Sequence, residues 1–157
     1  MEPTSPGDCD WTETDRGDAR FRRAKLGAAA GGDQLGCSLY ELPAGGKSWP
    51  YHYHTGNEEA VYVLAGAGTL RAPDGEHAIE AGDYAAFPAD ESGAHRVVND
   101  GDEPLRYLML STMADPDITV YPDSGKVHTF AGAPPGSEGE RRLDETYRRE
   151  DATGYWE

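Results

Sequence analysis

Basic residues are scarce in this sequence of 157 residues. Lysine and arginine together number 14 against 29 aspartates and glutamates, which gives a net charge of −15. Binding of nucleic acid phosphates or of an anionic membrane surface requires clustered positive charge. The composition therefore argues against nucleic acid and membrane partners. Acidic residues spread along the chain indicate a strongly hydrated surface, and they suggest the hypothesis of a halophilic protein in a salt-rich cytoplasm, where ionic strength screens the repulsion.

Long apolar runs are absent, and cysteines are few. No segment offers the roughly 20 apolar residues that cross a bilayer. Residues 1–15 are acidic and lack the basic and apolar regions of a secretion signal, so we expect a cytoplasmic protein. Cys9 and Cys37 could form at most one disulfide, and in a reducing cytoplasm we expect two free thiols.

Glycine and proline are abundant, at 20 and 11 residues, which favours short elements joined by tight turns. Segments rich in β-forming residues recur at intervals of roughly ten residues, a pattern typical of an all-β sandwich or barrel. The predicted strands cover 21–26, 35–42, 50–54, 60–71 with bends at Gly66 and Gly68, 77–80, 84–87, 95–98, 105–112, 118–121 and 127–130.

The ends of the chain differ in composition from its middle. Residues 1–20 predict an extended acidic arm, and residues 21–135 hold the strands of one β-barrel domain. Residues 136–157 predict a polar tail, in which 141–149 could form a short charged helix.

Three of the five histidines fall in two short stretches together with a carboxylate. His52 and His54 lie two residues apart in a predicted strand, so both side chains point to one side. Glu59 follows a turn and can reach back toward them, and His95 would come from a distant strand. Imidazoles and a carboxylate are donors that first-row transition metals accept. We therefore predict one metal site at His52, His54, Glu59 and His95.

Each of these residues has a plainer interpretation when taken singly. Two exposed histidines on one strand are common, and a lone glutamate is more often solvated than a ligand. Glu58 is the nearest rival of Glu59, but the start of the apolar run at Ala60 favours Glu59. We expect His77 on the surface and His128 outside the ligand set.

The metal-site residues also carry a resemblance to a known family. Gly46, His52, His54, Glu59 and Gly66 match the first motif of the cupin superfamily, and Gly82, Pro88, His95 and Asn99 match the second. Asp90 replaces a motif glycine, and the turn before His95 is longer than usual. The resemblance covers residues 35–112 and extends to small single-domain cupins, many of them functionally uncharacterised.

The resemblance implies a double-stranded β-helix (a jelly-roll barrel), often a homodimer, with a metal held at His52, His54, Glu59 and His95. Members include dioxygenases, decarboxylases and isomerases, so the fold does not decide the reaction. One divalent ion of Fe, Mn, Ni, Co, Cu or Zn suits these donors.

Three functions remain open from the sequence. The first is a metalloenzyme of oxygenase, decarboxylase or isomerase type acting on a small polar organic molecule. The second is a non-catalytic module that binds a small-molecule ligand at its metal. The third is a barrel whose metal only stabilises the fold. Glu58, Tyr40, Tyr84 and Arg106 are further candidates to line a pocket, whereas Val61, Val63, Phe87 and Met109 are expected in the core or the pocket wall.

Overall fold

The described residues of the protein fold into antiparallel strands that form three sheets. A computed structural model describes residues 2–137 and 139–157, so residues 1 and 138 of the predicted arm and tail lie outside the description. The sheets have the strand orders β1-β2-β3-β10-β5-β8, β13-β12-β11-β4 and β7-β6-β9. The helical elements of the described residues are α1 (Leu26–Ala29) and the short 3-10 turns η1 (Pro6–Asp8), η2 (Glu91–Gly93) and η3 (Arg149–Asp151). The prediction of an all-β fold is confirmed.

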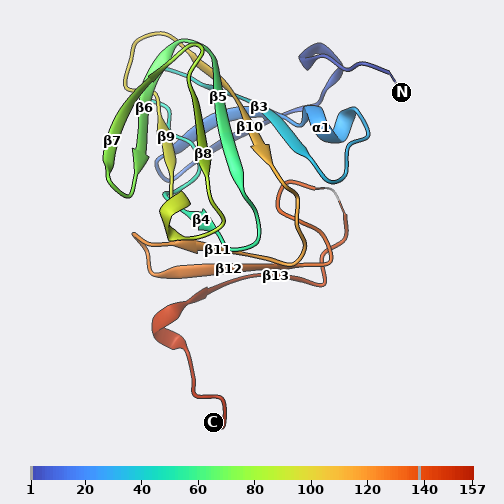
Figure 1. Cartoon of the computed structure of the whole chain (residues 1–157), viewed down its shortest axis with the longest axis vertical. Helices are drawn as coiled ribbons and strands as arrows, with labels where there is room; N and C mark the ends of the chain where they lie inside the picture. The colour runs from blue at the N-terminus through green and yellow to red at the C-terminus, as the bar shows by residue number, and fades with distance from the viewer. Residues whose placement is uncertain (1, 138) are drawn as a thin grey trace.

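The six-stranded sheet forms the main wall of the molecule (Figure 1). Its strands are β1 (Trp11–Arg16), β2 (Ala19–Ala24), β3 (Gly36–Leu42), β5 (Glu59–Ala65), β8 (Tyr84–Phe87) and β10 (Leu105–Ser111). In β5, Val61 and Val63 point inward and are buried, whereas Tyr62 and Leu64 point outward and are exposed. This alternation is the period of a strand with one buried face. Val61, Val63, Phe87 and Met109 belong to or pack against the core, as predicted.

The smaller sheets close the barrel. The three-stranded sheet contains β6 (Ala67–Ala72), β7 (Gly75–Glu80) and β9 (Arg96–Val98), and the four-stranded sheet contains β4 (Tyr53–His54), β11 (Asp117–Tyr121), β12 (Lys126–Ala131) and β13 (Leu143–Arg148). In Figure 1 the sheet with β11, β12 and β13 lies across one end of the barrel, and the residues after β13 extend away from the body. No helix of the described residues has the length and apolar character needed to cross a membrane.

The predicted strand over 60–71 is two strands in different sheets. The strand is interrupted at Gly66, where φ is +81°. A Cβ at this position would lie 2.5 Å from the carbonyl oxygen of Pro104. Only glycine adopts this conformation readily at such a close backbone approach. The bend predicted at Gly66 is therefore the point where the chain passes from β5 into β6.

The predicted helix over 141–149 is wrong, because residues 143–148 form strand β13. Every residue of β13 pairs with β12, from Leu143 opposite Ala131 to Arg148 opposite Lys126. Backbone hydrogen bonds from the neighbouring strand override the helical preference of the local charge pattern. The amino-terminal arm is likewise partly a strand, since β1 pairs with β2 along its whole length.

Candidate metal centre

The turn between β4 and β5 sets the positions of His54 and Glu59. His54 is the last residue of β4, and Glu59 is the first residue of β5. The buried side chain of Asn57 fastens the turn, because its Oδ1 accepts a hydrogen bond from the Ala114 amide at 2.5 Å and its Nδ2 donates to the Ala114 carbonyl at 3.2 Å. The turn is thereby attached to the segment that follows β10.

A backbone bridge brings His95 beside His52. The His95 amide donates to the His52 carbonyl at 2.8 Å, and the His52 amide donates to the His95 carbonyl at 3.3 Å. The prediction of a strand over 50–54 holds only for residues 53 and 54: Pro50 lacks the amide hydrogen that a ladder requires, and His52 forms only an isolated bridge. The isolated bridge still places the two imidazole rings 4.8 Å apart between centroids.

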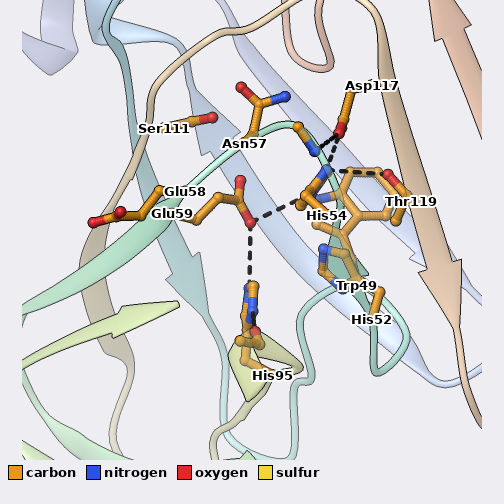
Figure 2. Close-up of polar contacts among 12 residues, drawn as sticks. Trp49, His52, His54, Asn57, Glu58, Glu59, His95, Ser111, Asp117 and Thr119 are labelled. Carbon is orange, nitrogen blue, oxygen red and sulfur yellow. Dashed lines mark hydrogen bonds and ion pairs between the residues drawn. The ribbon is translucent and has the colours of Figure 1, made fainter. Parts of the chain in front are cut away.

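The four predicted side chains meet in one place (Figure 2). Ligand atoms of His52, His54 and Glu59 all lie within 4.8 Å of one another. His95 lies outside this group of three but contacts its carboxylate: Nε2 of His54 and Nε2 of His95 are each 3.4 Å from Oε2 of Glu59. Glu58 is exposed, and Figure 2 shows its carboxylate pointing away from the histidines, so the geometry favours Glu59 over its rival.

Each histidine of the cluster is oriented by a hydrogen bond at Nδ1. His52 donates from Nδ1 to the Pro50 carbonyl at 2.7 Å, and His95 donates from Nδ1 to the Gly93 carbonyl at 2.9 Å. His54 donates from Nδ1 to Oδ2 of Asp117 at 2.5 Å. A carbonyl or carboxylate at Nδ1 assigns the ring hydrogen to that nitrogen. The Nε2 atoms of neutral imidazoles held in this way carry lone pairs.

Burial keeps two of these imidazoles neutral. It lowers the pKa of His95 to about 4, against its hydrogen bond to the Gly93 carbonyl. Burial, together with the neighbouring His95 and His54, lowers the pKa of His52 well below its ordinary value. Both rings are therefore unprotonated at neutral pH, which is the form that binds metal.

His54 and Glu59 behave differently, because carboxylates surround His54. Burial alone would lower the pKa of His54, but the hydrogen bond to Asp117 and the charge of Glu59 outweigh it and raise that pKa. Burial raises the pKa of Glu59, although His54 opposes the shift. Without a metal, a proton on Nε2 of His54 can face Glu59. A metal would displace that proton.

The donor set fits a divalent transition metal. Nε2 of His95 is buried and has no hydrogen-bond partner among the described residues. With Nδ1 carrying the hydrogen, this lone pair faces the oxygen of Glu59, so two electron donors confront each other. A cation would satisfy both, and three imidazoles with one carboxylate suit Fe, Mn, Ni, Co, Cu or Zn. That all four residues bind metal stays a prediction.

The cluster lies at the wall of a cavity of about 810 Å³. Tyr40 lines this cavity, in agreement with its candidacy as a pocket residue. His128 also lines the cavity, although we did not expect it among the metal ligands. Tyr84 instead borders a separate pocket of about 410 Å³. Arg106 pairs with Glu41 at 3.0 Å, so its charge is compensated there.

Sequence reasoning missed the partners of His54. Asp117 is buried, and its Oδ1 also accepts a hydrogen bond from the Gly56 amide at 2.8 Å. The hydroxyl of Thr119 lies 3.1 Å from Nδ1 of His54. Both residues sit on β11, which pairs with β4. In the sequence, the segment that holds Asp117 and Thr119 predicts a strand, and it gives no signal that either residue contacts His54.

Comparisons with known proteins agree with the fold. The chain is similar in structure to a sugar phosphate isomerase of the cupin superfamily from Silicibacter pomeroyi, with 27% identity over 93% of this chain and 92% of that one and a TM-score of 0.79. It is also similar to a candidate sugar phosphate isomerase from Acidithiobacillus ferrooxidans, with 31% identity over 87% and 81% of the two chains and a TM-score of 0.74. A polyketide cyclase from Streptomyces resistomycificus shares the fold, at 23% identity over 71% and 78% of the chains and a TM-score of 0.61.

The search of curated proteins found no match. The family model of the cupin domain matches residues 38–111, a range that contains both motifs recognised in the sequence, from Gly46 to Asn99. The double-stranded β-helix implied by the resemblance is confirmed. The chain belongs to the cupin superfamily.

Proposed function

We propose that the protein is a metal-dependent enzyme acting on a small polar organic molecule, and that isomerisation of a sugar phosphate is the reaction within this class to test first. The observation that carries the proposal is the convergence of three oriented imidazoles and Glu59 at the wall of a cavity of about 810 Å³. Cavities of this size hold ligands of metabolite size. Two similar structures support the choice of isomerase: one named a sugar phosphate isomerase, at 27% identity, and one named a candidate sugar phosphate isomerase, at 31% identity.

His52, His54, Glu59 and His95 would hold the ion. A divalent ion at this position supplies Lewis acidity, which polarises a substrate carbonyl or hydroxyl. Asp117 would keep the ring of His54 in its orientation through the hydrogen bond at Nδ1.

Isomerisation through an enediol also needs a group that moves a proton between neighbouring carbons. Glu59 would be engaged as a ligand, so another side chain has to do this. His128 lines the same cavity, and its Nε2 lies 2.6 Å from Oδ1 of Asp144. A histidine paired with a carboxylate can act as a general acid or base.

The first test is elemental analysis of the protein purified without a histidine tag. We expect near one equivalent of a transition metal, lost in His54→Ala and retained in His77→Ala. His77 is the matched control because it is exposed and bonds to Asp74, at 2.8 Å. Absence of metal after reconstitution, or its equal loss in both variants, would contradict the metal centre.

The second test is turnover. The metal-loaded protein is incubated with a panel of aldose and ketose phosphates in D₂O, and proton NMR follows conversion and the exchange of carbon-bound hydrogen. We expect conversion of at least one compound, abolished in His54→Ala. Metal content without conversion of any compound would argue against the isomerase and favour the alternative functions.

A non-catalytic binding module is the second candidate. It is favoured by the state of His128, whose other nitrogen, Nδ1, is also engaged, at 2.8 Å from the Thr146 hydroxyl. A histidine with both nitrogens occupied is less free to exchange protons with a substrate. A shift of the metal's absorption or magnetic resonance spectrum on adding a sugar phosphate, without turnover, would support this candidate.

A further inference from the structure

Arg23 places an uncompensated positive charge at the cavity wall. Along β2, Ala19, Phe21 and Arg23 point inward, whereas Arg20 and Arg22 point outward and are exposed. Arg23 lines the same cavity as the metal cluster and forms no ion pair with a carboxylate of the described residues. Arg141, which also lines the cavity, is paired with Asp144 at 2.8 Å. Although the chain carries a net charge of −15, no carboxylate of the described residues neutralises Arg23. Its positive charge is therefore available to an anionic ligand in the cavity.

Aromatic rings hold the Arg23 guanidinium in place. Its central carbon lies 5.8 Å from the ring centroid of Tyr40 and 5.8 Å from that of Trp49. The Tyr40 ring is stacked on Tyr107 at 5.2 Å, and Trp49 packs edge-on against Phe21 at 4.8 Å. Tyr40, Tyr107 and Phe21 belong to the core, whereas Trp49 is partly exposed. Because the core holds Tyr40 and braces Trp49 through Phe21, the charge is presented to the cavity from an ordered support, which lowers the entropic cost of binding.

Hydrogen-bond donors remain unused at this position. Nη1 of Arg23 donates to the Tyr40 hydroxyl at 3.3 Å, and Nε, which has no partner among the described residues, is shielded from solvent, so the guanidinium can meet a ligand only through its Nη atoms. The Tyr40 hydroxyl also accepts a hydrogen bond from Nε1 of Trp49 at 3.0 Å. With two donors directed at its oxygen, Tyr40 has its own hydrogen to donate. A guanidinium and a hydroxyl that both offer hydrogens match the oxygens of an anion.

We propose that Arg23 and Tyr40 bind the anionic group, a phosphate ester or a carboxylate, of the small molecule that reaches the metal centre. The inference rests on the proposed function in that it names the substrate class of the same cavity. Trp49, which contacts both residues of this anion subsite, lies three positions before His52 in the chain, and Trp49 and His52 both line the cavity. One small molecule can therefore span the two positions inside a single cavity.

The test measures the binding of inorganic phosphate and of acetate to the metal-loaded protein by isothermal titration calorimetry. We expect at least one of the two anions to bind. Arg23→Gln should weaken that binding by about 10- to 100-fold, the value of a charge-assisted hydrogen bond. Tyr40→Phe should weaken it by about 2- to 10-fold. Arg20→Gln is the matched control, because it removes the same charge from the outer face of the same strand, and it should change the dissociation constant less than twofold.

Metal content, measured in the same samples, separates the two proposals. Native metal content in Arg23→Gln with weakened anion binding supports the subsite; phosphate dependence then identifies a phosphate ester and acetate dependence a carboxylate. If neither anion binds the native protein at tens of millimolar, or Arg23→Gln binds as the native protein does, the subsite is refuted. The subsite is also refuted if Arg20→Gln weakens anion binding as much as Arg23→Gln does. It is refuted as well if anion binding disappears in His54→Ala alone, because the anion would then bind at the metal.

Two further variants keep the test decisive. If Arg23→Gln fails to fold by circular dichroism, Arg23→Lys retains the charge but loses the planar fork, and about a 10-fold loss is expected. Unchanged binding in Arg23→Lys together with unchanged binding in Tyr40→Phe would overturn the inference. A native protein that binds an anion through Arg23 but holds no metal would instead refute the proposed function and leave the subsite standing.

Discussion

Replacing Asp117 by asparagine should weaken metal binding although Asp117 is not one of the four predicted ligands. One carboxylate oxygen of Asp117 accepts from Nδ1 of His54 at 2.5 Å, and the other accepts from the Gly56 amide at 2.8 Å. An asparagine can accept only one of these hydrogen bonds, and its amide nitrogen must face the other donor. If that nitrogen faces His54, the ring hydrogen moves to Nε2 and blocks the proposed metal-binding atom.

The expected loss follows from the role of such a partner. Residues that orient a metal-binding histidine typically contribute 10- to 100-fold to metal affinity, which corresponds to about 1.4 to 2.8 kcal/mol. The short distance and the burial of Asp117 place the loss toward the upper part of this range.

The assay is competition between the protein and a chelating metal indicator, with Zn²⁺ or Mn²⁺ at pH 7.5. Asp123→Asn is the control, because it makes the same chemical change at an exposed carboxylate that pairs with Arg71. Equal affinities of Asp117→Asn and the native protein would refute the assignment of Asp117 as the residue that orients His54. So would an equal loss in Asp123→Asn.

Three further predictions follow from the pKa shifts, the backbone and the surface. Burial lowers the folded-state pKa of His95 to about 4 from 6.5, so the metal-free protein should lose about 3 kcal/mol of unfolding free energy from this residue as the pH falls from 6.5 to 4. Urea midpoints measured across this pH range test the loss. If the midpoints of His95→Gln fall as steeply with pH as those of the native protein, the prediction is contradicted. Gly66→Ala should destabilise by about 2 kcal/mol more than Gly82→Ala in urea unfolding, because both glycines have positive φ but only a Cβ at Gly66 meets backbone, at 2.5 Å; equal midpoints would show that the chain shifts freely there. We propose that the exposed apolar side chains of β5 and β8, which include Leu64 and Tyr84, are buried in a homodimer. Size-exclusion chromatography at low micromolar concentration should give a dimer for the native protein and a monomer for Leu64→Lys. A native protein that elutes as a monomer would refute the dimer.

Several features of the fold could be predicted because they depend on local sequence. Strand β8 lies at residues 84–87 as predicted, since alternating side chains between a glycine turn and Pro88 leave little choice. The common side of His52 and His54 follows from the period of an extended chain. Glu59 was favoured over Glu58 because the apolar run begins at Ala60, and the turn before β5 places it accordingly.

Other features depend on partners far along the chain. Residues 143–148 have the charge pattern of a short helix, yet β12 supplies a backbone ladder that turns them into a strand. The contact between His54 and Asp117 joins residues 63 positions apart. Arg23 meets Tyr40 only because β2 and β3 are neighbours in the sheet. Such contacts arise from strand order, which short-range propensity does not encode.

By itself, therefore, the sequence determined the all-β class, the residue types of the candidate metal site and the common side of His52 and His54, because periodicity and turn chemistry act over a few residues. The tertiary structure alone decided what surrounds those donors: the hydrogen bonds that orient each imidazole, the burial that keeps His52 and His95 neutral, and the arginine that shares their cavity. These depend on which strands become neighbours and on how much water the packed barrel excludes, and both are properties of the whole folded chain.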